Sequence, residues 1–194
     1  TGTGRLVVVD LHTRREVQAL DAHTKGIFRI VPLSTSTLAC AGGDGVLSTW
    51  SIERSEEPRL VPARMIPLCE EKLRDIVVSR AGDRSIVACG DGSLRMLDLP
   101  DLQEVQRFQW HEKGALCALF HPSKSVVLSG GKDGLVKAWR SDGACLLEFA
   151  AHKGPVYAIA FDPASRYLAT AGRDALIKLW DATTLEPIRR SARE

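Results

Sequence analysis

An internal repeat is the feature that most constrains how this chain of 194 residues can fold. Three segments align on one another, and each contains a His, an apolar run, an Asp and then a Trp. The His-to-Asp separations are 21, 22 and 22 residues, and each Asp precedes its Trp by six. The three sets are His23, Asp44 and Trp50; His111, Asp133 and Trp139; and His152, Asp174 and Trp180.

A degenerate fourth copy lies in the gap between the first two sets. Its run ends at Leu97, where the other copies have Trp, and Val9 ends a similar run near the start of the chain. Positions 9, 50, 97, 139 and 180 are therefore 41, 47, 42 and 41 residues apart. A period of about 40 to 45 residues is typical of the blades of a β-propeller.

The segments between these markers have the pattern of β-strands. They are short apolar runs rich in Val, Ile, Leu and Ala, separated by Gly-Asp, Asp-Gly and Pro-containing turns. The clearest copy predicts four strands, at residues 155–161, 167–171, 176–180 and 185–189. Residues 156–161, 116–120 and 27–31 are apolar on both faces, which predicts strands covered on both sides.

At these residues the chain resembles the WD40 family, and the resemblance covers nearly all of it. The Trp-Asp dipeptide stands at Trp180-Asp181, and Ala22-His23, Trp110-His111 and Ala151-His152 occupy the place of the family's Gly-His. The resemblance implies an all-β propeller of four-stranded antiparallel blades. It divides this single domain into the end of a split blade (1–20), a blade (21–66), a degenerate blade (67–109) and two further blades (110–149 and 150–194).

About four and a half blades are thus expected in this chain. WD40 proteins usually have seven, so about 95 residues of a seven-bladed ring are expected to precede these blades. The competing interpretations are a compact ring closed by this chain alone or by two copies together.

Composition narrows the functional classes. The net charge of +2 is small, which disfavours nucleic acid as a partner, and the longest apolar runs are too short for a membrane helix. Five cysteines without CxxC spacing predict reduced thiols, mostly buried in strands, and a cytoplasmic location. No metal or cofactor is expected.

The repeated polar sets resemble the structural tetrad of WD40 blades rather than catalytic triads. In that tetrad Trp donates to a hydroxyl, the hydroxyl bonds His, and Asp orients the imidazole. The expected hydroxyl positions are Ser129, Thr170 and, with a thiol instead, Cys40. In the degenerate copy Glu70 and Glu71 lie near the His position and Cys89 lies near the hydroxyl position. An enzyme needs only one catalytic site, whereas this set of residues recurs along the chain. A structural role is therefore favoured.

The resemblance also predicts a partner-binding face around the channel mouth. In WD40 domains, residues three and five after the tetrad His and one before the tetrad Asp look toward that face. Carried onto this sequence, the side chains that could bind a partner are Phe28, Lys72, Arg74, Leu116, Lys132, Tyr157 and Arg173. They include four cations and no acid, and aromatic and Arg side chains dominate protein interfaces.

The sequence therefore favours a non-catalytic scaffold or adaptor that binds a protein or peptide, and its clustered cations favour an acidic or phosphorylated segment. The alternatives are a propeller-type enzyme of hydrolase or lactonase type and, less favoured, a nucleic-acid platform. Residues 53–67 form the longest insertion, and their polar, Pro-interrupted segment 54–59 is interpreted as a solvated loop. The insertion is interpreted as a variable outer loop, with a partner contact as the alternative.

Overall fold

A computed structural model describes residues 2–54, 58–108 and 111–188 of the chain. All regular secondary structure in these ranges is β-strand. No helix long and apolar enough to cross a membrane occurs among the described residues.

The strands form five antiparallel sheets, each a meander of neighbours in sequence. The first sheet has two strands, β1 (Arg5–Val9) and β2 (Glu16–Asp21). The second has four: β3 (Ile27–Ser34), β4 (Thr37–Gly42), β5 (Val46–Glu53) and β6 (Arg59–Pro67). The third also has four: β7 (Leu73–Val78), β8 (Arg84–Cys89), β9 (Leu94–Asp98) and β10 (Glu104–Phe108).

The last two sheets differ in strand number. One contains β11 (Ala115–Phe120), β12 (Val126–Gly131), β13 (Leu135–Arg140) and β14 (Cys145–Ala150). The other contains β15 (Val156–Phe161), β16 (Tyr167–Gly172) and β17 (Ile177–Asp181). The predicted all-β architecture of antiparallel, four-stranded blades is thereby confirmed.

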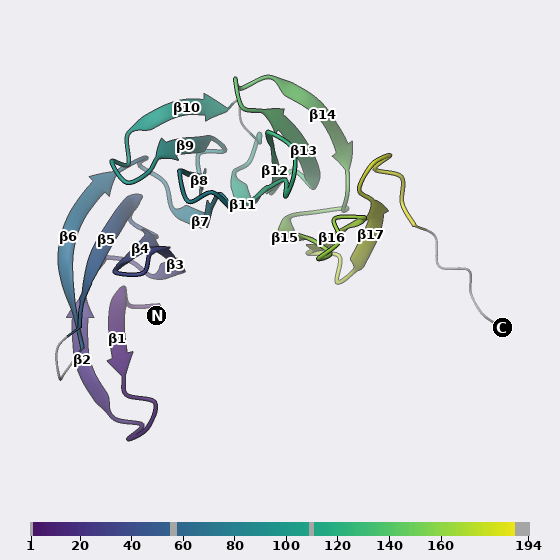
Figure 1. The fold of residues 1–194 in the computed structure, drawn as a ribbon. Coiled ribbons are helices and arrows are strands. Elements are labelled where there is room, and N and C mark those ends of the chain that lie inside the picture. The colour runs from purple at the N-terminus through teal and green to yellow at the C-terminus, as the bar shows by residue number, and fades with distance from the viewer. Residues whose placement is uncertain (1, 55–57, 109–110, 189–194) are drawn as a thin grey trace.

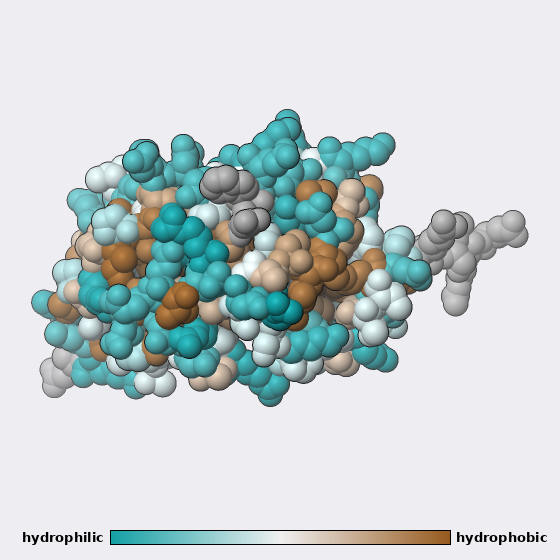
Figure 2. All heavy atoms as spheres, turned by 90° about the horizontal axis from the view of Figure 1, so that it is seen from above, coloured by the Kyte–Doolittle hydropathy of each residue, from teal (hydrophilic) through white to brown (hydrophobic). Residues whose placement is uncertain are grey.

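The sheets stand side by side in an arc (Figure 1). Strands β3, β7, β11 and β15 lie on its concave side, and β6, β10 and β14 lie on its convex side. Seen from the side of β10 and β14, most of the surface is hydrophilic, with smaller hydrophobic groups between (Figure 2). The number of blades in a closed ring stays a prediction.

Each interface between consecutive sheets holds its own apolar cluster. Leu6 packs with Trp50 between the first two sheets, and Leu47 packs with Ile76 between the second and third. Trp139 joins the third and fourth sheets, and Trp180 contributes to the cluster of the fourth and fifth. The core is therefore a series of blade-to-blade interfaces, and burying them is what stabilises the stack.

Two strand predictions need correction. The predicted strand at 185–189 is reduced to one isolated bridge between Trp180 and Pro187, and Arg189 lies outside the described residues. Most of the predicted outer-loop insertion at 53–67 is not a loop, because β6 occupies Arg59–Pro67 and pairs with β5 along its length. Of the connecting segment, residues 55–57 lie outside the described ranges.

The prediction of strands covered on both faces holds for β11 and is wrong for β3 and β15. In β11 every side chain is buried or half-buried, because sheets pack on both sides of it. Phe28, Ile30 and Tyr157, in contrast, are 44%, 49% and 56% exposed. Unlike β11, which packs between β7 and β15, β3 follows a sheet of only two described strands and β15 belongs to the last described sheet, so each has less sheet packed against it.

The turn after each Asp of the repeat gives a first testable prediction. Gly45, Gly92 and Gly134 adopt positive φ there, whereas the last sheet has Ala175 at φ 61°. Because a Cβ is strained in this region, Ala175→Gly is expected to raise the free energy of unfolding by up to about 1 kcal/mol. Urea denaturation measures the change. Ala182→Gly, at a turn residue without positive φ, is the control and should not stabilise the fold; equal effects would contradict the strain argument.

Candidate functional site

The His, hydroxyl, Asp and Trp side chains of the last two sheets form connected hydrogen-bond chains. His111 Nδ1 lies 3.0 Å from Asp133 Oδ1, its Nε2 lies 2.8 Å from Ser129 Oγ, and Trp139 Nε1 donates to the same Oγ at 2.8 Å. The corresponding distances among His152, Asp174, Thr170 and Trp180 are 2.7, 2.8 and 2.9 Å. Each chain ties the segment before the first strand to the second and third strands.

Burial argues that these sets are structural. His111 and Ser129 are fully buried, and the hydroxyl oxygen already receives the Trp139 N–H. Burial lowers the pKa of His111, although the Asp133 carboxylate opposes this shift. A Ser-His pair closed off from solvent in this way has no access to a substrate carbonyl, so its geometry serves rigidity.

The first set differs from the prediction in its hydroxyl residue. Cys40 is not its hydroxyl equivalent, because Ser48 on the adjacent strand fills that role. His23 Nε2 lies 2.8 Å from Ser48 Oγ, and Trp50 Nε1 donates to this oxygen at 2.8 Å. Cys40 and Ser48 are paired across β4 and β5, so the hydroxyl reaches the same space from the neighbouring strand. Burial raises the pKa of the Cys40 thiol to about 11.

The Asp of the first set is held as a carboxylate. Asp44 lies 3.0 Å from His23 Nδ1 and accepts the N–H of Thr24 at 2.9 Å. Partial burial raises the pKa of Asp44, but the Thr24 N–H and His23 outweigh it, and the net shift is downward.

The degenerate blade differs from the sequence assignment. Cys69, and not Glu70 or Glu71, occupies the tetrad His position, since its N–H points to Gly45 O as that of His111 points to Gly92 O. Val87 occupies the hydroxyl position, as its pairing with the residue opposite on β9 shows. Cys89 lies two residues further along β8, so the predicted equivalence of Cys89 with the hydroxyl is wrong.

Six of the seven predicted partner-binding residues come together on the concave side. A cavity of about 440 Å³ is lined by Phe28, Arg74, Leu116, Lys132, Pro155, Tyr157 and Arg173. These residues come from β3, β7, β11 and β15, from the turns that follow β12 and β16, and, for Pro155, from the position just before β15. Among the described residues that line this cavity there is no carboxylate. The seventh predicted residue, Lys72, lines an adjoining cavity with Phe28 and Gly43.

One cation of this surface is positioned by an aromatic ring. The Arg74 guanidinium carbon lies 4.7 Å from the centre of the Phe28 ring, which is within cation–π range. The Arg74 Nε is buried, and within the described residues it has no hydrogen-bond partner. This arrangement leaves a pre-positioned donor beside two exposed aromatic side chains, Phe28 and Tyr157.

Sequence reasoning missed two charged residues next to this cavity. Asp75 and Arg29 line a second cavity, of about 310 Å³, that shares Phe28 and Tyr157 with the first. Asp75 pairs with Arg29 Nε at 3.4 Å and accepts the N–H of Ala118 at 3.2 Å, and its burial raises its pKa. Adjacent charges at Arg74-Asp75, inside an otherwise apolar strand, are the signal that could have identified them.

The cysteines are all free, as expected, but not all buried. Cys40, Cys89 and Cys117 are buried, Cys69 is half-buried and Cys145 is exposed at the first position of β14. Cys145 thus lies in a strand, as predicted, but its side chain is exposed and not buried.

Comparison with known proteins agrees with this geometry. The family described as "WD domain, G-beta repeat" matches residues 102–140 and 143–181. A Periodic tryptophan protein 2 homolog of Caenorhabditis elegans is 27% identical over 64% of this chain and 14% of its own length. Telomerase protein component 1 of Rattus norvegicus is 27% identical over 80% of this chain and 6% of its own length. WD repeat-containing protein 70 of Xenopus tropicalis is 30% identical over 53% of this chain and 17% of its own length.

Blades with His-hydroxyl-Asp-Trp chains define a repeat protein of the β-propeller class. The family match identifies WD40 repeats at residues 102–140 and 143–181, and with the WD-repeat relative it supports assignment of the chain to the WD40-repeat family. Members of this family generally act as scaffolds for protein interactions. The chain spans 6–17% of the three relatives compared above, so their whole activities do not carry over to it.

Proposed function

We propose that this chain is a non-catalytic scaffold whose concave surface binds an acidic or phosphorylated peptide. The observation that carries the proposal is the cavity of about 440 Å³ in which Arg74, Lys132 and Arg173 surround two exposed aromatic side chains. Cations supply charge-assisted hydrogen bonds to carboxylate or phosphate oxygens, and aromatic side chains supply apolar contact at little entropic cost.

The placement of the cations supports a peptide ligand over a polyanion. They converge from several blades on one cavity instead of forming a long stripe, and the net charge of the chain is only +2. A nucleic-acid platform relies on many phosphate contacts spread over a basic surface. The free thiols also favour a reducing compartment, and we include a cytoplasmic location in the proposal.

A matched pair of peptide libraries tests the proposal. Fluorescence anisotropy compares a degenerate phosphoserine library with the same library carrying serine. The phosphorylated library is expected to bind more tightly. Arg173→Glu is expected to weaken binding by about 10-fold or more, because it replaces a charge-assisted contact with repulsion. Tyr157→Ala is expected to weaken the binding of both libraries, because it removes an apolar contact.

Lys124→Glu is the control for the charge change. Lys124 is exposed in the turn after β11, away from the residues that line the cavity. Equal losses for Lys124→Glu and Arg173→Glu would show nonspecific attraction to a cationic protein. Phosphate-independent binding, or no binding of either library, would contradict the proposed ligand class.

A further inference from the structure

The degenerate blade holds two thiols and a carboxylate in the space that a tetrad imidazole occupies elsewhere. The backbone of Cys69 lies at the tetrad His position. Its amide N lies 3.3 Å from Gly45 O, just as the amide N of His152 lies 3.1 Å from Gly134 O. Its side chain is shorter than imidazole, so the ring's volume is left to another group.

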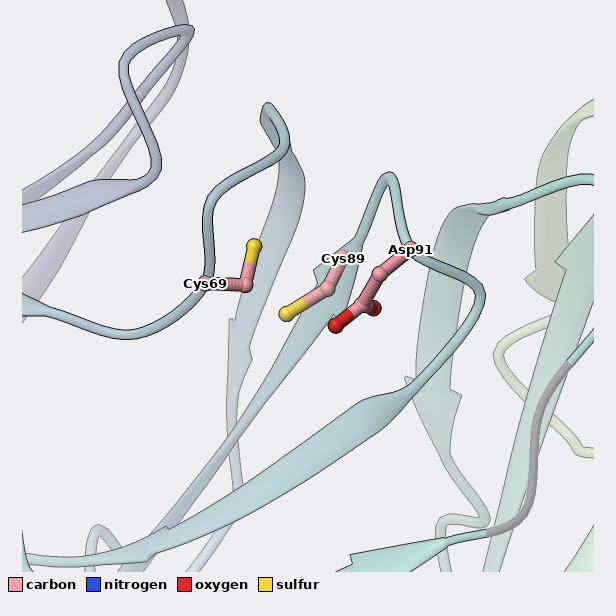
Figure 3. Close-up of side chains that lie close together, drawn as sticks. All are labelled: Cys69, Cys89 and Asp91. Atoms are coloured by element: carbon pink, nitrogen blue, oxygen red, sulfur yellow. The ribbon is translucent and has the colours of Figure 1, made fainter.

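Cys89 supplies that group. It pairs with Leu73 as Gly131 pairs with Ala115, so it stands where the other blades have Gly. A Cβ on Gly131 would lie 2.3 Å from Nδ1 of His111, which is why Gly is required there. Cys69 in place of His therefore makes room for Cys89 in place of Gly, and the two thiols face each other across that space (Figure 3).

Asp91, the Asp of this blade, completes the group. The Sγ atoms of Cys69 and Cys89 and a carboxylate oxygen of Asp91 all lie within 4.8 Å of one another. It is the one group of three such side chains in the described part of the chain. Cys69 is half-buried and the Asp91 side chain is 34% exposed, so the group can be reached from solvent.

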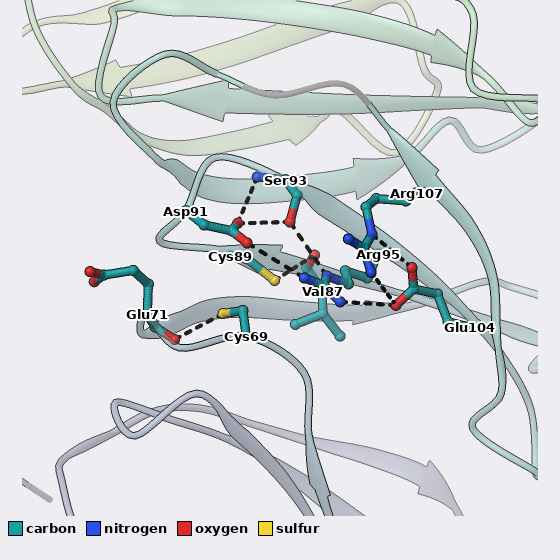
Figure 4. A network of polar contacts seen from close by, with 9 residues as sticks. All are labelled: Cys69, Glu71, Val87, Cys89, Asp91, Ser93, Arg95, Glu104 and Arg107. Carbon is teal, nitrogen blue, oxygen red and sulfur yellow. Dashed lines mark hydrogen bonds and ion pairs between the residues drawn. The ribbon is translucent and has the colours of Figure 1, made fainter.

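The surrounding contacts fix the carboxylate (Figure 4). Asp91 Oδ1 accepts the N–H and hydroxyl of Ser93 at 2.9 and 2.7 Å. Arg95 Nη2 lies 3.5 Å from Asp91 Oδ2, and Arg95 Nη1 donates to Glu104 Oε2 at 3.0 Å. Hydrogen bonds of this kind, from neighbouring residues to a ligating group, orient that group and raise the affinity of a metal site.

We propose that Cys69, Cys89 and Asp91 bind one divalent cation of the zinc class, with a fourth coordination position open to solvent. Thiolate and carboxylate are ligands that Zn²⁺ accepts, at about 2.3 Å for sulfur and about 2.0–2.2 Å for oxygen. Donor atoms around a tetrahedral ion are then roughly 3.5–3.8 Å apart, so this group needs only a small closing movement. Two thiolates, Asp91 and the Arg95 guanidinium balance the ion's charge.

Zinc binding at this site is coupled to loss of the thiol protons. A hydrogen bond with Cys89 lowers the pKa of Cys69, and the same pairing together with burial raises the pKa of Cys89. Zinc must displace the thiol protons, so binding is expected to release protons and to strengthen as pH rises.

A zinc titration of the reduced, chelator-stripped chain tests the proposal. Competition with a chromogenic chelator is expected to give one ion per chain with a Kd below about 1 μM. Co²⁺ is expected to bind at the same site and to give a thiolate-to-metal charge-transfer band. Zinc is also expected to raise the Tm, because it binds the folded state.

Three variants locate the ion. Cys69→Ser, Cys89→Ser and the isosteric Asp91→Asn are each expected to weaken zinc binding by at least about 10-fold. Cys145→Ser removes an exposed thiol outside the group and should leave affinity unchanged. Circular dichroism of each variant shows whether it is folded, and Asp91→Asn keeps the test valid if a Cys variant does not fold.

Two outcomes would overturn the proposal. One is the absence of stoichiometric binding by the reduced wild-type chain. The other is binding that Cys145→Ser weakens as much as Cys69→Ser, which would indicate adventitious capture by accessible thiols.

Discussion

Trp139→Ala is expected to lower the free energy of unfolding by about 3–5 kcal/mol through lost packing alone. Trp139 is 1% exposed and lies in the apolar cluster between the third and fourth sheets. The centre of the Trp139 ring lies 6.0 Å from the centre of the Phe108 ring and 5.8 Å from Lys137 Nζ. Truncation also removes the N–H donated to Ser129, which adds about 1–3 kcal/mol for a buried polar group left without its partner. Urea denaturation at constant pH measures the total.

Trp139→Phe separates the two contributions. It keeps an aromatic ring in the cluster and removes the indole N–H, so its cost is expected to be clearly smaller than that of Trp139→Ala. A Trp139→Ala chain that unfolds at the same urea concentration as the parent would contradict the assignment of this side chain to the blade core.

The repeat spacing was sufficient to predict the blades and most of their polar chains. His, Asp and Trp recur at fixed separations because each bridges the same three points of a blade, so their positions in the sequence are tightly coupled. The hydroxyl is less constrained. Cys40 and Ser48 face each other across two paired strands, and either could reach the imidazole of His23; only the fold shows that Ser48 does.

The outer strand β6 could not be recognised from its pattern. Prolines at 58, 62 and 67 and several charges indicate a loop, because Pro cannot donate to a sheet. β6 is an edge strand that pairs only with β5 among the described strands, so an N–H on its outer side has no partner to lose. Edge position overrides the local signal here, and edge position is a property of the fold.

The candidate binding surface was predicted in part. Its four cations, two aromatics and Leu116 follow from their spacing relative to the tetrad His and Asp, and six of these seven residues line one cavity. The ion pair of exposed Arg29 and half-buried Asp75 was missed, because it depends on how β3 and β7 lie against each other. The thiol pair was missed because the alignment placed Glu70 and Glu71, which lie one and two residues too late, near the His position.

The exchange of His and Gly for two Cys in the degenerate blade leads to the second large prediction. Gly131→Cys is expected to lower the free energy of unfolding by more than about 4 kcal/mol, because its Cβ would lie 2.3 Å from His111 Nδ1 and 2.6 Å from Asp133 Oδ1. Removing the ring should relieve the clash. The double variant His111→Cys/Gly131→Cys is therefore expected to be less destabilised than the sum of its single changes by about 1–3 kcal/mol.

A distant pair provides the control for this cycle. Gly131→Cys combined with His23→Cys, a residue of another blade, should be additive within about 0.5 kcal/mol. The two cycles differ only in whether the removed imidazole occupies the volume that the new thiol needs. Equal behaviour of the two pairs, or a well tolerated Gly131→Cys with His111 intact, would show that Gly131 is not required by the ring. The thiol pair of the degenerate blade would then need an explanation other than shared volume.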